Sequence, residues 1–179
     1  PERSLSIDAP FFTNQIEVIT NIVKSLPIGY RLFVKEHPAM KLLAWRETSF
    51  YKELMKLPNV FLLHPFIDPQ QILENCSLVI TITGTAGFEA AFYNKPSIIM
   101  ADLIYSSIPS THRLKSFEEL PLAIKNSLEK KVNVSDLNEY VQRIENESFE
   151  INLDSIRQDF SNTVFYGGYL VDFDIPVSK

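Results

Sequence analysis

The sequence predicts an α/β protein with a Rossmann-like, doubly wound parallel sheet, and three observations support this. Short runs rich in apolar and β-branched residues, such as residues 77–82, alternate with segments of helical periodicity. The links between them are short, which favours βαβ units with right-handed crossovers and parallel strands. The 179 residues are 45% hydrophobic, which is enough for one buried core and argues against disorder.

The elements expected up to residue 100 follow from local patterns. Residues 15–24 have apolar side chains at i, i+3, i+4 and i+7 and predict an amphipathic helix. Asp68 and Pro69 are a typical N-cap and first helical residue. The run at 77–82 is typical of a strand covered on both faces. The other elements expected here are strands at 30–35, 60–63 and 97–100 and helices at 49–57, 69–75 and 88–93.

The pattern changes after Asp102. An irregular segment with several Pro and Ser residues precedes short charged helices at 120–129 and 137–144. A last helix is expected at 155–166, followed by an extended tail. We therefore predict a core over residues 1–105 and, over residues 106–179, a helical extension and C-terminal tail that pack on the same domain.

Composition excludes several classes of protein. The net charge of −5 and the pI of about 5.2 argue against a general nucleic-acid binder. The single Cys excludes a disulfide framework and a multi-Cys zinc site. No apolar run approaches the roughly 20 residues that span a bilayer. We expect a soluble, cytoplasmic protein, and Pro1 in place of Met suggests a fragment of something larger.

Residues suited to chemistry follow three predicted strands. The first strand ends in Lys-Glu-His-Pro at residues 35–38, and the second ends in His64 and Pro65. The third is followed by Thr-Gly-Thr-Ala-Gly at residues 83–87. Ligands of open parallel sheets bind beyond the carboxyl ends of the strands, so we expect the three clusters to share one edge.

The third cluster is a strand-to-helix turn made of Thr83, Gly84, Thr85, Ala86 and Gly87. Its glycines let backbone N–H groups approach a ligand, and the helix that follows favours an anion such as phosphate. The competing interpretation is that the glycines only permit a tight turn and close helix–sheet packing. The chain has only five glycines, and this scarcity favours a functional role.

Single polar residues near these turns are weaker indications of a functional site than the turn itself. Glu89, one turn into the helix, suits the two hydroxyls of a sugar diol, although helix starts commonly carry Glu. His37 and His64 can donate to phosphate, whereas a histidine bonded to a backbone carbonyl is the commoner outcome for each alone. Cys76 is expected in the core rather than as a nucleophile. No residues show metal-ligand spacing, so no metal is expected.

Together these motifs resemble the C-terminal domain of GT-B glycosyltransferases, especially the capsule and surface-carbohydrate biosynthesis proteins that include bacterial CMP-Kdo-dependent transferases. The resemblance covers roughly residues 1–105. Pro1-Glu2-Arg3 looks like the loop after the first strand of that domain, a strand that would then be missing here. The likeness is carried by residues 34–38, 59–65, 79–90 and 94–96.

The resemblance implies a domain that binds a nucleotide-sugar donor, with a CMP-sugar favoured, a UDP-sugar as the second choice and no other cofactor. His37 would contact donor phosphate, residues 83–87 would cradle it, and Glu89 would hold the ribose hydroxyls. The residues expected to flank the base are Pro65, Phe66 and Ile67. The catalytic residue is unassigned, with Glu36 and His37 as candidates, and Glu36 has Lys35 or Arg31 as alternative partners.

The resemblance also implies partners and leaves alternatives. A glycan or glycolipid acceptor would be bound by a missing N-terminal domain, so this fragment is expected to be inactive alone. Peripheral association of the full-length enzyme with the inner face of the membrane is left open. The alternatives are a UDP-sugar 2-epimerase-like domain, a CDP-glycerol transferase-like domain and a non-catalytic nucleotide-binding or scaffold domain. The acidic, Gly-rich turn of the epimerases and the Asp-Tyr-Ser-Ser-type turn of the polymerases are both absent at residues 83–87.

Overall fold

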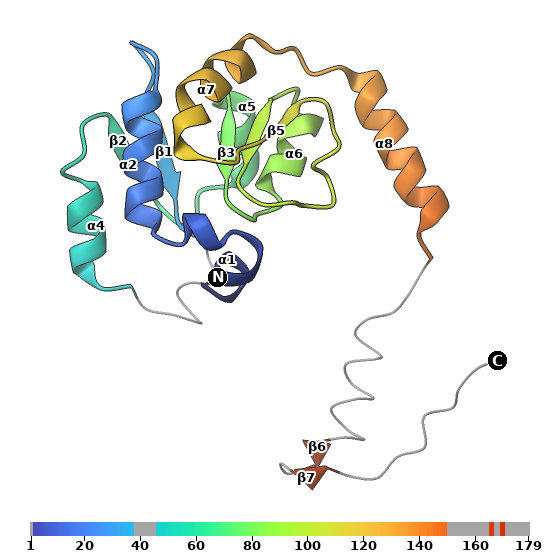
Figure 1. Cartoon of the computed structure of the whole chain (residues 1–179), viewed down its shortest axis with the longest axis horizontal. Helices are drawn as coiled ribbons and strands as arrows, with labels where there is room; N and C mark the ends of the chain where they lie inside the picture. Colours follow the sequence, from blue (N-terminus) through green and yellow to red (C-terminus); the bar gives the residue numbers. More distant parts are fainter. Residues whose placement is uncertain (1, 38–45, 150–164, 167–168, 171–179) are drawn as a thin grey trace. The chain divides into compact units, whose positions relative to one another are not determined.

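The computed structural model describes residues 2–37, 46–149, 165–166 and 169–170 (Figure 1). The chain divides into two compact units, residues 1–140 and residues 141–179. In the second unit, β6 (Phe165–Tyr166) pairs antiparallel with β7 (Tyr169–Leu170). The first unit contains the parallel strands and the candidate site, so the fold of this unit is what positions the site.

The parallel strands of the first unit form two sheets. β1 (Leu32–Lys35) pairs with β2 (Val60–Leu63). The second sheet has the order β3-β4-β5, in which β3 is Val79–Thr81, β4 is Ser97–Ile99 and β5 is Thr111–Arg113. Every strand pair in both sheets is parallel, which confirms the predicted Rossmann-like α/β fold class.

Helices precede or follow most of these strands, close to the positions that the sequence predicts. Asn14 caps α2 (Gln15–Ser25), because its side chain accepts from the N–H group of Glu17 at 3.3 Å. Asp68 caps α5 (Pro69–Asn75) in the same way, accepting from the N–H group of Gln70 at 3.0 Å. None of the described helices is both long enough and apolar enough to cross a membrane. The helices are α1 (Glu2–Asp8), η1 (Pro10–Phe12), α2 (Gln15–Ser25), α4 (Thr48–Leu54), α5 (Pro69–Asn75), α6 (Ala86–Phe92), η2 (Phe117–Glu119), α7 (Leu120–Glu129) and α8 (Val134–Glu147).

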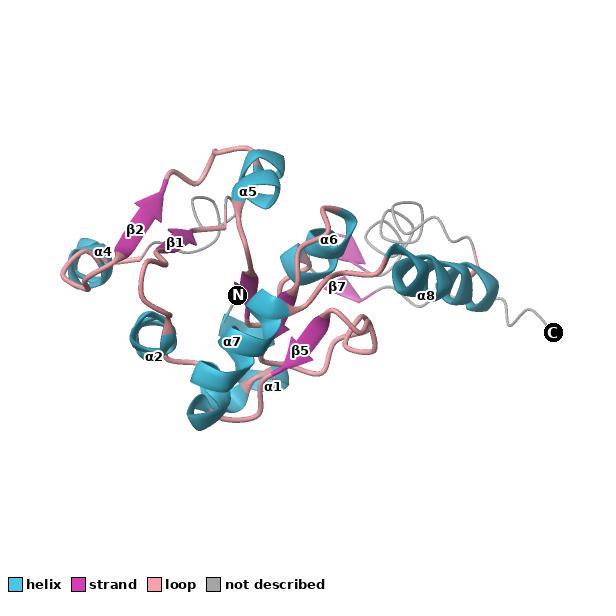
Figure 2. Cartoon of the chain, turned by 90° about the horizontal axis from the view of Figure 1, so that it is seen from above, coloured by secondary structure: helices cyan, strands magenta, loops and turns pink. Residues whose placement is uncertain are grey.

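Strand β4 is the centre of the core, since both of its isoleucines are fully buried. Ile98 belongs to a cluster that includes Ile22 of α2 and Ile124 of α7. Ile99 lies on the other side, against Gly87 of α6. Figure 2 shows α6 on one side of the three-stranded sheet and α2 and α7 on the other. Helices therefore cover both faces of β4, as in a doubly wound fold.

Strand β3 differs from the prediction that it is covered on both faces. All three of its residues are only half-buried, because β4 is its only strand neighbour among the described residues. Likewise, β1 pairs only with β2 in the described part of the chain. A doubly wound sheet has the strand order 3-2-1-4-5-6, so its first strand lies between the second and the fourth. If a first strand preceded β1, then β1 would be the second strand and β3 the fourth. That a first strand is missing stays a prediction.

Three other local predictions are wrong. Glu2 and Arg3 belong to α1 rather than to the loop expected at residues 1–3, and Leu5 of this helix is buried. Thr111–Arg113 form β5 within the segment expected to be irregular, because a strand with His112 at its centre has no apolar alternation to reveal it. Phe165–Tyr166 are a strand rather than the end of a helix. The rest of that predicted helix, residues 155–164, lies outside the described residues.

The predicted division of the chain into a core over residues 1–105 and an extension over residues 106–179 stays a prediction. The first compact unit itself extends to Tyr140. Residues beyond 105 contribute to its core, since Leu120 and Ile124 of α7 are fully buried in the cluster around β4.

The contact between α6 and β4 depends on glycine at position 87. A Cβ there would lie 2.8 Å from the Tyr105 hydroxyl and 3.2 Å from Cγ2 of Ile99. We expect Gly87→Ala to lower the free energy of unfolding by about 1–3 kcal/mol, because these buried neighbours must shift. Urea unfolding measures this, with Ala86→Ser as the control because Ala86 is exposed. Equal stability of the two variants would contradict this account of the packing.

Candidate functional site

Two of the three predicted clusters lie at the same edge of one sheet. Lys35 lies opposite Leu63 at the carboxyl ends of β1 and β2, so Glu36 and His64 follow from adjacent strand ends. The turn at residues 83–87 follows β3, which belongs to the other sheet. The expected convergence of all three clusters on one site stays a prediction.

The turn after β3 presents a row of backbone donors. Gly84 N–H donates to Thr81 Oγ1 at 3.1 Å, and the Gly84 carbonyl accepts from the Tyr105 hydroxyl. The N–H groups of Thr85, Ala86 and Gly87 have no acceptor within the described part of the chain. The first N–H groups of every helix lack intrahelical acceptors, and such groups can bind an anion.

The glycines of this turn have packing reasons of their own. A Cβ on Gly84 would lie 2.7 Å from Thr81 Oγ1, and one on Gly87 would meet Tyr105. These contacts support the competing interpretation of the glycines as packing residues. The feature of this turn that points to an anion site is therefore its N–H groups and not the presence of glycine.

Glu89 lies on the first turn of α6 and is exposed. Its Oε1 accepts from Thr85 Oγ1 at 2.8 Å, so the helix start already holds this carboxylate in one orientation. A carboxylate fixed beside a row of N–H donors can accept from hydroxyl groups of a ligand whose anionic part binds those donors.

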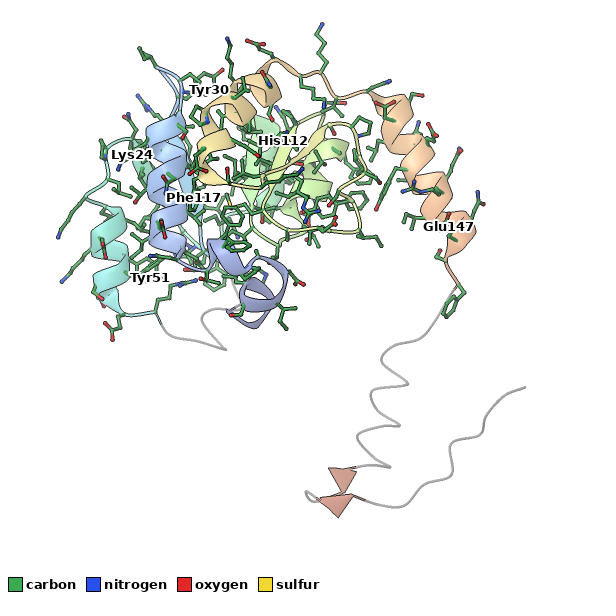
Figure 3. The ribbon with its side chains drawn as sticks, in the orientation of Figure 1. Lys24, Tyr30, Tyr51, His112, Phe117 and Glu147 are labelled. Atoms are coloured by element: carbon green, nitrogen blue, oxygen red, sulfur yellow. The ribbon has the colours of Figure 1, made fainter. Side chains whose placement is uncertain are left out.

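Glu36 is tied into the structure by several hydrogen bonds. Its Oε2 accepts from Arg46 Nε at 2.8 Å and from the Tyr51 hydroxyl at 3.3 Å, and its Oε1 accepts from His37 N–H at 3.3 Å. Arg46 also donates to Gln15 of α2 at 2.7 Å. Burial and the Glu36 charge raise the pKa of Tyr51, labelled in Figure 3 on α4, so the phenol remains a donor. The carboxylate thus joins the end of β1 to α2 and α4.

These contacts replace the partners that the sequence suggested for Glu36, since the ion pair is with Arg46 rather than with Lys35 or Arg31. Arg31 instead lies over the ring of Phe61, 5.7 Å from its centre. A carboxylate engaged by three donors is a weak candidate for proton transfer. His37 is exposed and keeps its predicted place at the strand end.

The loop after β2 is organised by His64. Its Nδ1 accepts from Phe66 N–H at 3.3 Å, and its carbonyl accepts from Ile67 N–H at 3.0 Å. A neutral histidine that accepts at Nδ1 carries its proton at Nε2, where it can donate to a ligand. The N–H groups of Phe66 and Ile67 are used locally, so the backbone groups that these two residues leave for a ligand are their carbonyl oxygens.

Sequence reasoning missed Tyr105. Its side chain is only 3% exposed, and its hydroxyl holds the Gly84 carbonyl. Burial, with a smaller contribution from the charge of Glu89, raises the pKa of Tyr105 to about 12. No sequence pattern predicts a hydrogen bond from a tyrosine hydroxyl to a backbone carbonyl 21 positions away.

Thiol and metal chemistry find little support in the described residues. Cys76 is half-buried, and burial raises the pKa of its thiol, which lowers the fraction of reactive thiolate. Within residues 2–37 and 46–149, no three His, Cys, Asp or Glu side chains gather closely enough to hold a metal ion.

The ion pair at the end of β1 is expected to stabilise the fold. Its side chains are only 19% exposed at Glu36 and 14% at Arg46. We expect Glu36→Gln and Arg46→Met each to lower the free energy of unfolding, with a coupling energy of about 1 kcal/mol between them. Urea unfolding of the two single variants and the double variant measures this. Additive effects would show that the pair contributes nothing.

The raised pKa of Tyr105 predicts a pH dependence of stability. Between pH 10 and about 12 the unfolded chain releases this proton while the folded chain keeps it, so the free energy of unfolding falls as pH rises. Tyr105→Phe should lose less stability than the wild type between pH 9 and 11. Tyr30→Phe, which removes an exposed phenol, is the control. An identical pH dependence in wild type and Tyr105→Phe would refute this assignment.

Comparison with known proteins gives the family. A family model described as "Capsule polysaccharide biosynthesis protein" matches residues 11–112, more than half of the chain. The match includes β1 to β4, the turn at residues 83–87 and Tyr105. Neither a curated protein nor a solved structure matches the chain. On the strength of the family match, the chain belongs to the capsule polysaccharide biosynthesis proteins.

Proposed function

We propose that the first compact unit is the donor-binding domain of a GT-B-type glycosyltransferase that builds capsular or surface polysaccharide. The donor is a CMP-activated sugar such as CMP-Kdo. The observation that carries this proposal is the row of N–H groups at Thr85, Ala86 and Gly87 that have no acceptor among the described residues. They follow a parallel strand in a chain of the capsule biosynthesis family.

The chemistry of glycosyl transfer requires such donors. Negative charge builds on the phosphate as it leaves the sugar, and a preorganised donor aimed at that charge contributes about 3 kcal/mol in a dry site. The three N–H groups of the turn supply donors whose position is set by the backbone. Nε2 of His64 and the exposed side chain of His37 can add to them.

The loop after β2 favours cytosine over uracil. The exocyclic amine of cytosine donates hydrogen bonds, whereas uracil presents an oxygen at the same position and needs a donor. Because the N–H groups of Phe66 and Ile67 already donate to His64, carbonyl oxygens are what the loop can offer. This supports a CMP-sugar as donor. Glu89 accepts from the ribose hydroxyls in this arrangement.

The catalytic base comes from elsewhere in this proposal. Glu36 is held by Arg46, Tyr51 and the His37 N–H. The glycan or glycolipid acceptor, and the group that removes its proton, therefore belong to an acceptor domain. The described unit alone binds the donor and does not transfer the sugar.

Titration calorimetry with CMP, CDP and UDP tests the donor class. We expect CMP to bind more tightly than UDP, because the loop after β2 offers carbonyl oxygens to the base. A preference for UDP would favour an epimerase or a UDP-sugar transferase, and a preference for CDP would favour a CDP-glycerol transferase. Absence of binding to all three would reject the proposal in favour of a scaffold role.

Two variants test the roles of single residues. We expect His37→Ala and Glu89→Ala each to weaken CMP binding roughly ten- to a hundredfold, the loss of one hydrogen bond to a charged group. Both side chains are exposed, so unfolding should be unchanged. Glu53→Ala on α4 is the control, since Glu53 is also an exposed helical carboxylate.

A change of ligand identifies the contact made by Glu89. If Glu89 holds the ribose diol, the 2′-deoxy analogue of CMP should bind the wild type weakly and should lose little more in Glu89→Ala. Binding of CMP to both variants as tightly as to the wild type would reject these site assignments.

A further inference from the structure

We infer that Tyr105 is a positioning residue that fixes the peptide unit at the centre of the turn at residues 83–87, so that its N–H group faces the bound phosphate. This inference rests on the proposed function, because it assigns a role at the same site. The juxtaposition that supports it is the Tyr105 hydroxyl donating to the Gly84 carbonyl, directly before the three unpartnered N–H groups.

The geometry of the peptide bond connects the two observations. The carbonyl of Gly84 and the N–H of Thr85 belong to one planar trans unit, in which C=O and N–H point in opposite directions. Because Tyr105 is buried, the bond to its hydroxyl turns the Gly84 carbonyl inward. The Thr85 N–H must then point outward, and both Gly84 and Thr85 are exposed.

The preceding peptide unit is fixed as well. Gly84 N–H donates to Thr81 Oγ1 at 3.1 Å, so both backbone groups of Gly84 have side-chain partners. Glycine has more backbone freedom than any other residue, and ordering it costs more entropy. Two hydrogen bonds at this glycine hold the turn in one conformation before a ligand arrives, which lowers the cost of binding.

Tyr105 is itself held in place. Its ring lies beside that of Phe88, with 5.8 Å between ring centres, and Phe88 lies the same distance from Tyr140. The Tyr140 hydroxyl donates to the Ile104 carbonyl at 2.9 Å, next to Tyr105 in the chain. Because its pKa is raised to about 12, Tyr105 keeps the proton that it donates at neutral pH.

The test compares CMP with cytidine, which lacks the phosphate. In Tyr105→Phe the ring stays and only the hydroxyl is lost. We expect CMP to bind about fivefold more weakly, as for the loss of one neutral hydrogen bond, while cytidine binding changes less than twofold. Tyr30→Phe is the control, because it removes the hydroxyl of an exposed tyrosine outside the turn. It should leave the ratio of the two affinities unchanged.

A structural role alone gives a different result. If Tyr105→Phe weakens CMP and cytidine equally, or weakens neither, Tyr105 does not position the turn toward phosphate. The amide resonances of Gly84 and Thr85 provide a second measurement that needs no ligand. The inference requires both to shift in Tyr105→Phe and to stay in place in Tyr30→Phe.

The two measurements separate this inference from the proposed function. If the wild type binds no nucleotide, the proposed function fails, and the amide resonances together with a titration by inorganic phosphate then decide the role of Tyr105. A Thr85 amide that responds to phosphate in the wild type, and less in Tyr105→Phe, supports positioning at an anion site of another kind. Amide resonances that are unmoved by the substitution overturn the inference whatever the nucleotide data show.

Discussion

The structure depends on the burial of strand β4 between two layers of helices. Ile98 faces α2 and α7, while Ile99 faces α6, and neither side chain is exposed to solvent. Close contact on the Ile99 side requires a residue without a side chain at position 87, and the same contact brings Tyr105 against α6. The packing that stabilises the core therefore also determines where the turn before α6 lies.

The candidate site is built from backbone more than from side chains. Its clearest feature is the set of N–H groups at Thr85, Ala86 and Gly87, whose direction follows from the start of α6 and from the bonds at Gly84. Glu36, which the sequence offers as a candidate catalytic residue, ties the end of β1 to Arg46. In the proposed function, this site would bind the anionic part of the donor, and the acceptor and its base would come from another surface.

The sequence predicts elements where one residue pattern determines the local structure. The strands β1 to β4 and the helix α2 follow from apolar periodicity, and α5 follows from capping by Asp68. It fails where tertiary contacts decide: β5 is a strand because it pairs with β4, and β3 is half-buried because β4 is its only strand partner among the described residues. Likewise, the sequence indicated the turn at residues 83–87, but the partners of Glu36 and His64 depend on side-chain geometry.

The omission of Tyr105 has a physical cause that bears on how the turn works. Local reasoning places a phosphate turn in residues 83–87 because glycine and threonine occur together there, yet glycine alone leaves such a turn free to adopt many conformations. Order must come from contacts outside the turn, and here it comes from Thr81 on one side and Tyr105 on the other. Tyr105 is in turn packed through Phe88 against Tyr140. Residues up to the end of the first compact unit thus determine the shape of a turn that lies near its middle.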